Sequence, residues 1–84
     1  MAIVTMMPEA LRDFDKLPKT IKERFRNLRE RLQEWPSVSG AKPLSGKLAG
    51  HYRLRTGDYR LRLHVEGETI IIDKIGLRKD IYDD

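Results

Sequence analysis

The sequence predicts a small α+β domain in which two N-terminal helices pack on a curved antiparallel β-sheet, in the order β-α-α-β-β-β. Apolar side chains recur at helical spacing in residues 8–35, whereas residues 51–75 are strand-like and are interrupted by glycine-containing turns. A chain of 84 residues is short enough for one domain, so we expect a single domain over 1–84.

The first half of the chain predicts one strand followed by two helices. Residues 1–6 form the strand, Pro8 suits the first turn of a short helix, and Pro18 opens a longer one. Pro36 ends the longer helix because proline lacks an N–H, and residues 37–49 then form a loop. The longer helix carries an apolar stripe, at spacings of four, three, four and three, that we expect to lie on the sheet: Ile21, Phe25, Leu28, Leu32 and Trp35.

The register of the first predicted hairpin follows from its turn. Strands 51–56 and 59–65 flank Gly57 and Asp58, and a third strand over 69–75 follows a turn at Glu66-Gly67. As the first of two turn residues, Gly57 supplies the positive φ of a type II′ turn. This register places three pairs on the face that covers the helices: Thr56 with Tyr59, Leu54 with Leu61, and Tyr52 with Leu63.

The opposite face, which we call the basic face, carries three further pairs: Arg55 with Arg60, Arg53 with Arg62, and His51 with His64. Like charges directly opposite each other destabilise a sheet, and the second hairpin is expected to set Asp73 opposite Arg60 and relieve only part of the repulsion. Guanidinium groups bind phosphate bidentately and stay charged. We therefore interpret the basic face as a surface for a nucleic-acid backbone, with a merely solvated basic face as the alternative.

Composition narrows the class of protein. Seventeen Lys and Arg against thirteen Asp and Glu give a net charge of +4, which by itself favours a nucleic-acid partner only weakly. The chain has no cysteine, so disulfides and thiolate metal sites are excluded and a reducing compartment suits it. The longest apolar run, Ile70–Ile72, is far too short for a membrane span, and the first residues lack a secretion signal. We expect a cytoplasmic protein without a membrane partner.

Several motifs together resemble the RelE/ParE toxin superfamily, over nearly the whole chain. In order, they are Leu44-Ser45-Gly46, Tyr52-Arg53-Leu54-Arg55, Gly57-Asp58-Tyr59-Arg60 and Ile75-Gly76-Leu77-Arg78-Lys79-Asp80-Ile81-Tyr82. The RelE branch of this family comprises endoribonucleases that cut messenger RNA in the ribosomal 30S A site without a metal. The resemblance thus implies a bacterial or archaeal type II toxin with no cofactor or metal, whose partners are ribosome-bound mRNA and a cognate antitoxin in a hetero-oligomer.

The resemblance also implies residue roles. The ribose 2′-OH attacks the adjacent phosphate, which requires a base, donors for the extra negative charge, and an acid for the leaving oxygen. Arg60 and Arg78 correspond to a clamp on the phosphoryl oxygens, and Tyr82 to a residue that stacks on a base or transfers a proton. The implied catalytic set is Arg55, Arg60, Arg78 and Tyr82, and the implied RNA-binding set is Arg53, Arg55, Arg62, His51 and His64.

The chain departs from the RelE pattern at two places. Lysines are common where this chain has Arg53 and Arg55, and an arginine cannot give up its proton to act as a base. Tyr82 is then the expected base, with His51 or His64 as alternatives. A histidine also often precedes the last-loop arginine, where this chain has Leu77.

Two other functions remain open at this point. The ParE branch shares the fold but poisons DNA gyrase without cleaving RNA, and it lacks the RelE-type catalytic set. The other alternative is a non-enzymatic relative that binds nucleic acid or a partner protein. The identity of the antitoxin, the codon preference and the need for the ribosome do not follow from the sequence.

Overall fold

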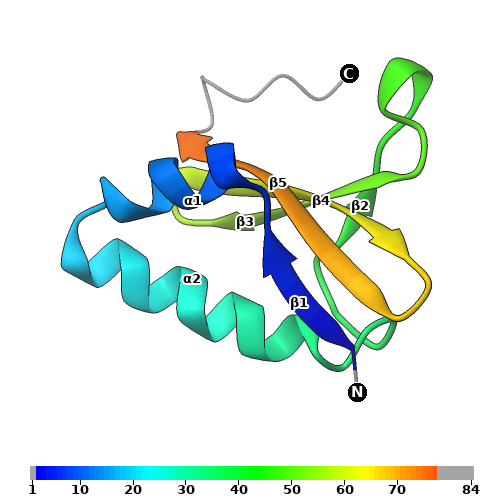
Figure 1. Cartoon of the computed structure of the whole chain (residues 1–84), viewed down its shortest axis with the longest axis horizontal. Helices are drawn as coiled ribbons and strands as arrows, with labels where there is room; N and C mark the ends of the chain where they lie inside the picture. Colours follow the sequence, from blue (N-terminus) through cyan, green and yellow to red (C-terminus); the bar gives the residue numbers. More distant parts are fainter. Residues whose placement is uncertain (1, 78–84) are drawn as a thin grey trace.

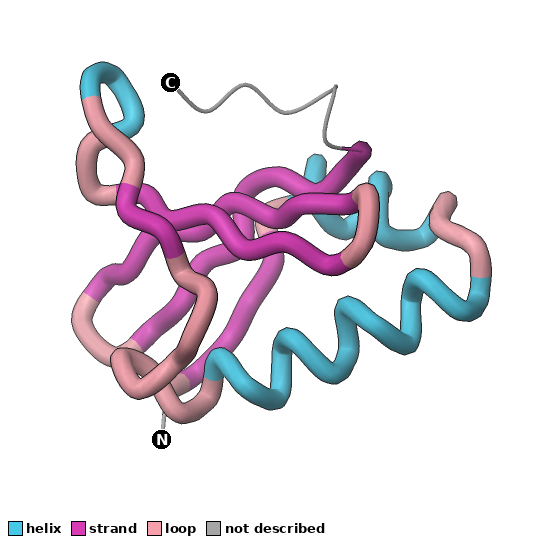
Figure 2. Tube along the Cα trace, turned by 180° about the vertical axis from the view of Figure 1, so that it is seen from behind, coloured by secondary structure: helices cyan, strands magenta, loops and turns pink. Residues whose placement is uncertain are grey.

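The computed structural model describes residues 2–77, in which two α-helices cover one face of a five-stranded sheet (Figure 1; seen from behind in Figure 2). The α+β architecture predicted from the sequence is confirmed. Neither α-helix in this part of the chain has the length and apolarity that a bilayer crossing requires. The elements are β1 (Ile3–Met6), α1 (Pro8–Asp15), α2 (Lys19–Leu32), β2 (Lys42–Pro43), the 3-10 helix η1 (Gly46–Leu48), β3 (His51–Thr56), β4 (Tyr59–Glu66) and β5 (Thr69–Leu77).

The sheet is mixed, with the strand order β1-β5-β4-β3-β2. Strand β1 runs parallel to β5, with Ile3 beside Thr69 and Met6 beside Ile72, whereas the pairs β2–β3, β3–β4 and β4–β5 are antiparallel. The antiparallel prediction thus fails for β1. Tight turns force antiparallel pairing on strands that are joined directly, but two helices separate β1 from the rest of the sheet, so no turn fixes its direction.

The predicted loop over residues 37–49 contributes a fifth strand. Lys42 pairs with Arg53 and Pro43 pairs with Tyr52, which makes β2 an edge strand of two residues. A proline is tolerated there because an edge strand needs hydrogen bonds on one side only. The guanidinium of Arg31 donates a 2.7 Å hydrogen bond to the carbonyl oxygen of Ser39 and so ties this segment to α2.

The core lies between the sheet and the helices. From the predicted stripe, Phe25, Leu28 and Leu32 are buried, and α2 ends at Leu32. Trp35 lies just beyond the helix and packs edge-on against Tyr52, with 4.8 Å between ring centroids. The buried apolar residues are Val4, Ala10, Phe25, Leu28, Leu32, Leu54, Leu61, Leu63, Ile70, Ile72 and Ile75.

The register of β3 and β4 is confirmed pair by pair, from Thr56 opposite Tyr59 to His51 opposite His64. Gly57 has a φ of 61°, and Asp58 keeps a negative φ, as a type II′ turn requires. One face of this hairpin therefore supplies leucines to the core, and the other carries the arginines and histidines.

The predicted register of the second hairpin is wrong. Glu66 pairs with Thr69, so the turn consists of Gly67 and Glu68, and Gly76 lies opposite Arg60 where Asp73 was expected. The physical reason is the positive φ of 62° at Gly67, which places this glycine at the first central position of its turn, as at Gly57.

A β-bulge shifts the register further, between Arg62 and Leu63 on β4. Ile72 pairs with Leu63 and Lys74 pairs with Arg62, which leaves Asp73 as the additional residue on β5. If side chains alternated strictly between the two faces of the sheet after Ile72, Lys74 would point toward the core. The additional residue at the bulge shifts this alternation by one, so that Ile75 points toward the core instead. Lys74 forms an ion pair with Glu9 of α1, at 3.2 Å.

We predict that Gly57→Ala lowers the free energy of unfolding by about 1–2 kcal/mol, because an alanine disfavours positive φ. A Cβ atom at Gly57 would also lie 2.8 Å from Nη1 of Arg24, a flexible side-chain end that can move aside. The matched control is Gly67→Ala, where φ is 62° and no heavy atom lies within 4 Å. Urea denaturation should give similar losses for both variants; two neutral substitutions would contradict the assigned turns.

Candidate nucleic-acid interface

Strands β3 and β4 position the whole basic face. Directly opposite residues of an antiparallel pair share one face of the sheet, so the register gathers all six predicted RNA-binding or catalytic residues of this hairpin on the side away from the leucine core. They are Arg53, Arg55, Arg60, Arg62, His51 and His64. Arg78 and Tyr82, which complete the predicted catalytic set, lie outside the described residues.

The four arginines differ in their access to solvent. Arg55 is exposed and the Arg62 side chain is 21% exposed, whereas Arg53 and Arg60 are each only 8% exposed. Each opposed pair therefore joins one covered guanidinium to a more accessible one. An anion arriving from solvent therefore meets Arg55 and Arg62 before it meets Arg53 and Arg60.

Asp73 concentrates negative charge at the histidine end of the basic face. Its Oδ1 accepts a 2.7 Å hydrogen bond from Nε of Arg62, while its Oδ2 lies 3.0 Å from Nδ1 of His64 and 3.2 Å from Nε2 of His51. We call Asp73, Arg62, His51 and His64 the Asp73 cluster. The sequence reasoning missed this cluster, although the spacing of Ile72 and Ile75 signals the bulge that creates it.

His64 is held between two carboxylates. Besides its contact with Asp73, its Nε2 lies 3.1 Å from Oε2 of Glu66. The hydrogen bond to Asp73 is the main cause that raises the pKa of His64 above 6.5; desolvation acts in the opposite direction, and Glu66 adds a further increase. The imidazolium form donates from both nitrogens at once and satisfies both carboxylates.

This geometry disfavours either histidine as the base for a ribose hydroxyl. Both nitrogens of His64 already face carboxylate oxygens. In His51, Nε2 faces Asp73, and Nδ1 is buried with no hydrogen-bond partner among residues 2–77. Tyr82, the base expected from the sequence, lies outside the described residues.

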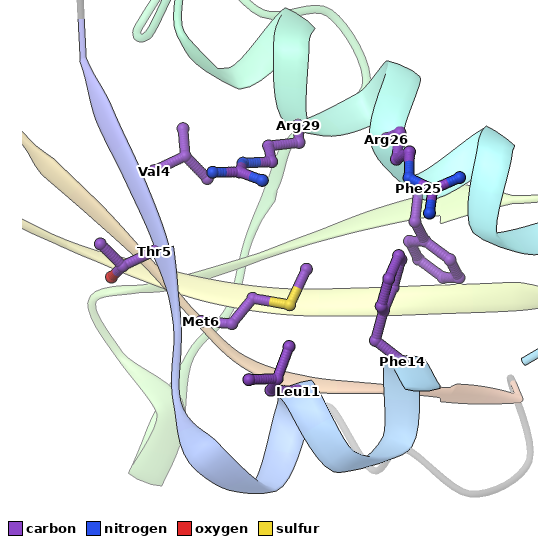
Figure 3. Close-up of a pocket in the computed structure, with 8 residues that line it drawn as sticks. All are labelled: Val4, Thr5, Met6, Leu11, Phe14, Phe25, Arg26 and Arg29. Carbon is purple, nitrogen blue, oxygen red and sulfur yellow. The ribbon is translucent and has the colours of Figure 1, made fainter. Parts of the chain in front are cut away.

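A separate apolar pocket of about 240 Å³ lies between β1 and the two helices (Figure 3). Met6, Leu11, Phe14 and Phe25 gather toward its centre (Figure 3), and Leu11 is 48% exposed. Of these residues the sequence placed only Phe25 in the apolar stripe that was expected to lie on the sheet, and it did not predict an opening here. The pocket is lined by Val4, Thr5, Met6, Leu11, Phe14, Phe25, Arg26 and Arg29.

Comparison with known proteins identifies the family to which this fold and basic face belong. A family model described as the ParE toxin of the type II toxin-antitoxin system, parDE, matches residues 4–82. The chain belongs to the RelE/ParE toxin superfamily. This toxin is also 34% identical over 76 residues to Toxin RelE3 of Methanocaldococcus jannaschii, a match that covers 87% of this chain and 86% of that protein.

Solved structures of RelE proteins share the fold of this toxin. A chain of the RelBE2 toxin–antitoxin complex of Mycobacterium tuberculosis superposes with a TM-score of 0.79 at 28% identity, covering 92% of this toxin and 98% of that chain. A chain of the RelB–RelE antitoxin–toxin complex of Methanococcus jannaschii gives 0.76 at 29% identity, covering 92% and 93%. The isolated RelE toxin of E. coli, at 20% identity and a TM-score of 0.77, shares the fold and covers 92% of this toxin and 84% of that chain.

We predict that this toxin loses stability as the pH rises through the pKa of His64. The pKa of His64 is higher in the folded state than its unfolded-state value of 6.5. Protonated His64 therefore contributes its full stabilisation of the fold below pH 6.5, and this stabilisation is lost as the pH rises above the folded-state pKa. His64→Gln should remove this part of the pH dependence. Thermal unfolding between pH 5.5 and 8.5, with EDTA present to exclude trace metals, measures it. A wild-type profile that the substitution leaves unchanged would refute the assigned cause.

Proposed function

We propose that this toxin is a ribosome-dependent endoribonuclease that cleaves messenger RNA in the 30S A site and thereby inhibits translation. The observation that carries the proposal is the pairing of Arg55 with Arg60 and of Arg53 with Arg62 on one face of the sheet. Guanidinium groups bind phosphate bidentately and stay charged, and a sugar–phosphate backbone presents a series of negative charges to such a face. The similarity to Toxin RelE3 supports the RelE branch.

The proposed reaction is attack of the ribose 2′-oxygen on the neighbouring phosphorus, which forms a 2′,3′-cyclic phosphate. The P–O bond to the 5′-oxygen breaks, and this oxygen takes up a proton from solvent to leave as a hydroxyl group. Tyr82 takes the hydroxyl proton in this scheme, a step that guanidinium groups beside the phenol would favour. Arg55, Arg60 and Arg78 donate hydrogen bonds to the phosphoryl oxygens, whose negative charge increases in the transition state. No metal takes part.

The proposed partner is a cognate antitoxin that binds this toxin in a hetero-oligomer. Structures of RelE proteins in complex with RelB antitoxins support this proposal. An acidic segment over the basic face would occupy the accessible guanidiniums of Arg55 and Arg62 and so block RNA. We place the activity in the cytoplasm of a bacterium or archaeon, where the ribosomes are.

We predict that Arg60→Ala and Arg78→Ala abolish growth inhibition, because each removes a donor to the scissile phosphate; losing one such donor costs about 10²–10³-fold in rate. Arg12→Ala, which removes an exposed arginine from α1, has the same charge change and should remain toxic. Mapping RNA 5′ ends after induction measures cleavage, and circular dichroism confirms folding. Full toxicity of either folded site variant would remove that residue from the site.

We also predict that RNA binding weakens steeply with salt and that Arg55 contributes to this dependence. Loss of one phosphate contact lowers the slope of log K against log salt by about 0.7 for single-stranded RNA. RNA binding is measured by fluorescence anisotropy at KCl concentrations from 50 to 300 mM, about a sixfold range. The slope should be shallower for Arg55→Ala than for the wild type, and it should be unchanged for Arg12→Ala. Equal slopes for all three proteins would place Arg55 outside the RNA contact.

Gyrase poisoning is the second candidate, favoured by the match to the ParE toxin model over residues 4–82. The two functions predict different effects in cells after expression of the toxin is induced. Truncated messages without DNA damage support the nuclease, whereas double-strand breaks and an SOS response with intact messages support the gyrase poison. If neither effect appears while the folded toxin still binds RNA, the chain is a non-enzymatic relative.

A further inference from the structure

The Asp73 cluster brings two imidazoles and one carboxylate together from three neighbouring strands. His51 lies on β3, His64 on β4 and Asp73 on β5, and one ligand atom from each lies within 4.8 Å of the other two. We propose that His51, His64 and Asp73 form a binding site for one divalent transition-metal ion, with Zn²⁺ as the best match.

The spacing of these atoms fits tetrahedral zinc coordination. Zn–N and Zn–O bonds of about 2.0–2.2 Å place neighbouring ligand atoms about 3.3–3.6 Å apart. The two nitrogen-to-oxygen distances, 3.0 Å from His64 Nδ1 and 3.2 Å from His51 Nε2 to Asp73 Oδ2, are close to this spacing. A pair as far apart as 4.8 Å would have to close by about 1.2–1.5 Å, which small rotations of two partly exposed rings provide.

Neighbouring residues orient two of the three ligands as protein metal sites require. Nε2 of His64 lies 3.1 Å from Oε2 of Glu66, so the tautomer that carries its proton on Nε2 can donate to Glu66 and leaves Nδ1 as the metal-binding atom. A metal-bound histidine commonly donates its other N–H to a carboxylate in this way. Nε of Arg62 donates to Oδ1 of Asp73 and turns Oδ2 toward the imidazoles.

Charge and access also suit a bound cation. The carboxylates of Asp73 and Glu66 offset the nearby guanidinium of Arg62 and contribute negative charge beside the ion. The side chains of His51, His64 and Asp73 are 27%, 27% and 14% exposed, so an ion can enter from solvent. The fourth coordination position is then open to water or to an anionic oxygen.

The ligand types select the class of metal. Imidazole nitrogens favour Zn²⁺ and neighbouring first-row ions, whereas Mg²⁺ and Ca²⁺ prefer sites built from oxygen atoms. The proposed ion takes no part in the cleavage chemistry proposed above, which uses Arg55, Arg60, Arg78 and Tyr82. His51 and His64 also belong to the predicted RNA-binding set, so zinc binding is measured directly and not through RNA cleavage.

The test titrates the tag-free full chain at pH 7.5 with Zn²⁺ against a chromophoric chelator and with Co²⁺ by visible absorption. We expect one Zn²⁺ per chain, a cobalt spectrum typical of four-coordinate geometry, and no competition from a large excess of Mg²⁺. His51→Gln, His64→Gln and Asp73→Asn should each weaken zinc binding at least tenfold. Glu66→Ala should weaken it by about tenfold, through loss of the hydrogen bond that orients His64.

The matched control is Asp58→Asn, at the exposed turn between β3 and β4, which should bind zinc as the wild type does. Circular dichroism establishes that each variant is folded, and the two histidine variants decide the question if Asp73→Asn does not fold. Absence of saturable zinc binding to the wild type would overturn the proposal. So would zinc binding that His51→Gln and His64→Gln leave unchanged.

Discussion

Burial of Leu54, Leu61 and Leu63 against the helices forces the arginines of β3 and β4 together on the other face. Burying a leucine stabilises the fold by about 1.5–3 kcal/mol, whereas like charges directly opposite each other cost at most about 1 kcal/mol per pair. The hydrophobic contribution is therefore the larger of the two. A one-residue slip would expose the leucines and turn arginines toward the core, so the register that stabilises the fold also assembles the basic face.

A carboxylate lies at one end of the basic face. At this histidine end, Asp73 contacts Arg62, His51 and His64 at distances of 2.7 to 3.2 Å. At the turn end, Arg60 lies opposite Arg55 on β3 and opposite Gly76 on β5. The same face thus contains a region with its own carboxylate beside a region of opposed arginines, and this division separates the proposed metal site from the proposed phosphate site.

Membership of the RelE/ParE superfamily determines the fold of this toxin, but it does not determine the molecule on which the toxin acts. RelE structures at 20% to 29% identity retain the fold with TM-scores of 0.76 to 0.79, because the leucine and isoleucine core tolerates substitutions that preserve its volume and pattern. The target depends instead on a few polar side chains carried by that fold. In this toxin the proposed side chains are arginines of β3 and β4 together with Arg78 and Tyr82, which lie beyond the described residues.

Local signals in the sequence were sufficient for the helices and the first hairpin. The stripe of Phe25, Leu28 and Leu32 and the turn at Gly57 act over a few residues, and the structure reproduces both the helix and all six pairs of β3 with β4. The parallel pairing of β1 with β5 and the position of Asp73 depended on tertiary structure. Strand β1 finds its partner across more than sixty residues of chain, and no local pattern sets that direction. The bulge at Asp73 exists because Ile72 and Ile75 both have to reach one core, a requirement that acts only once the helices cover the sheet.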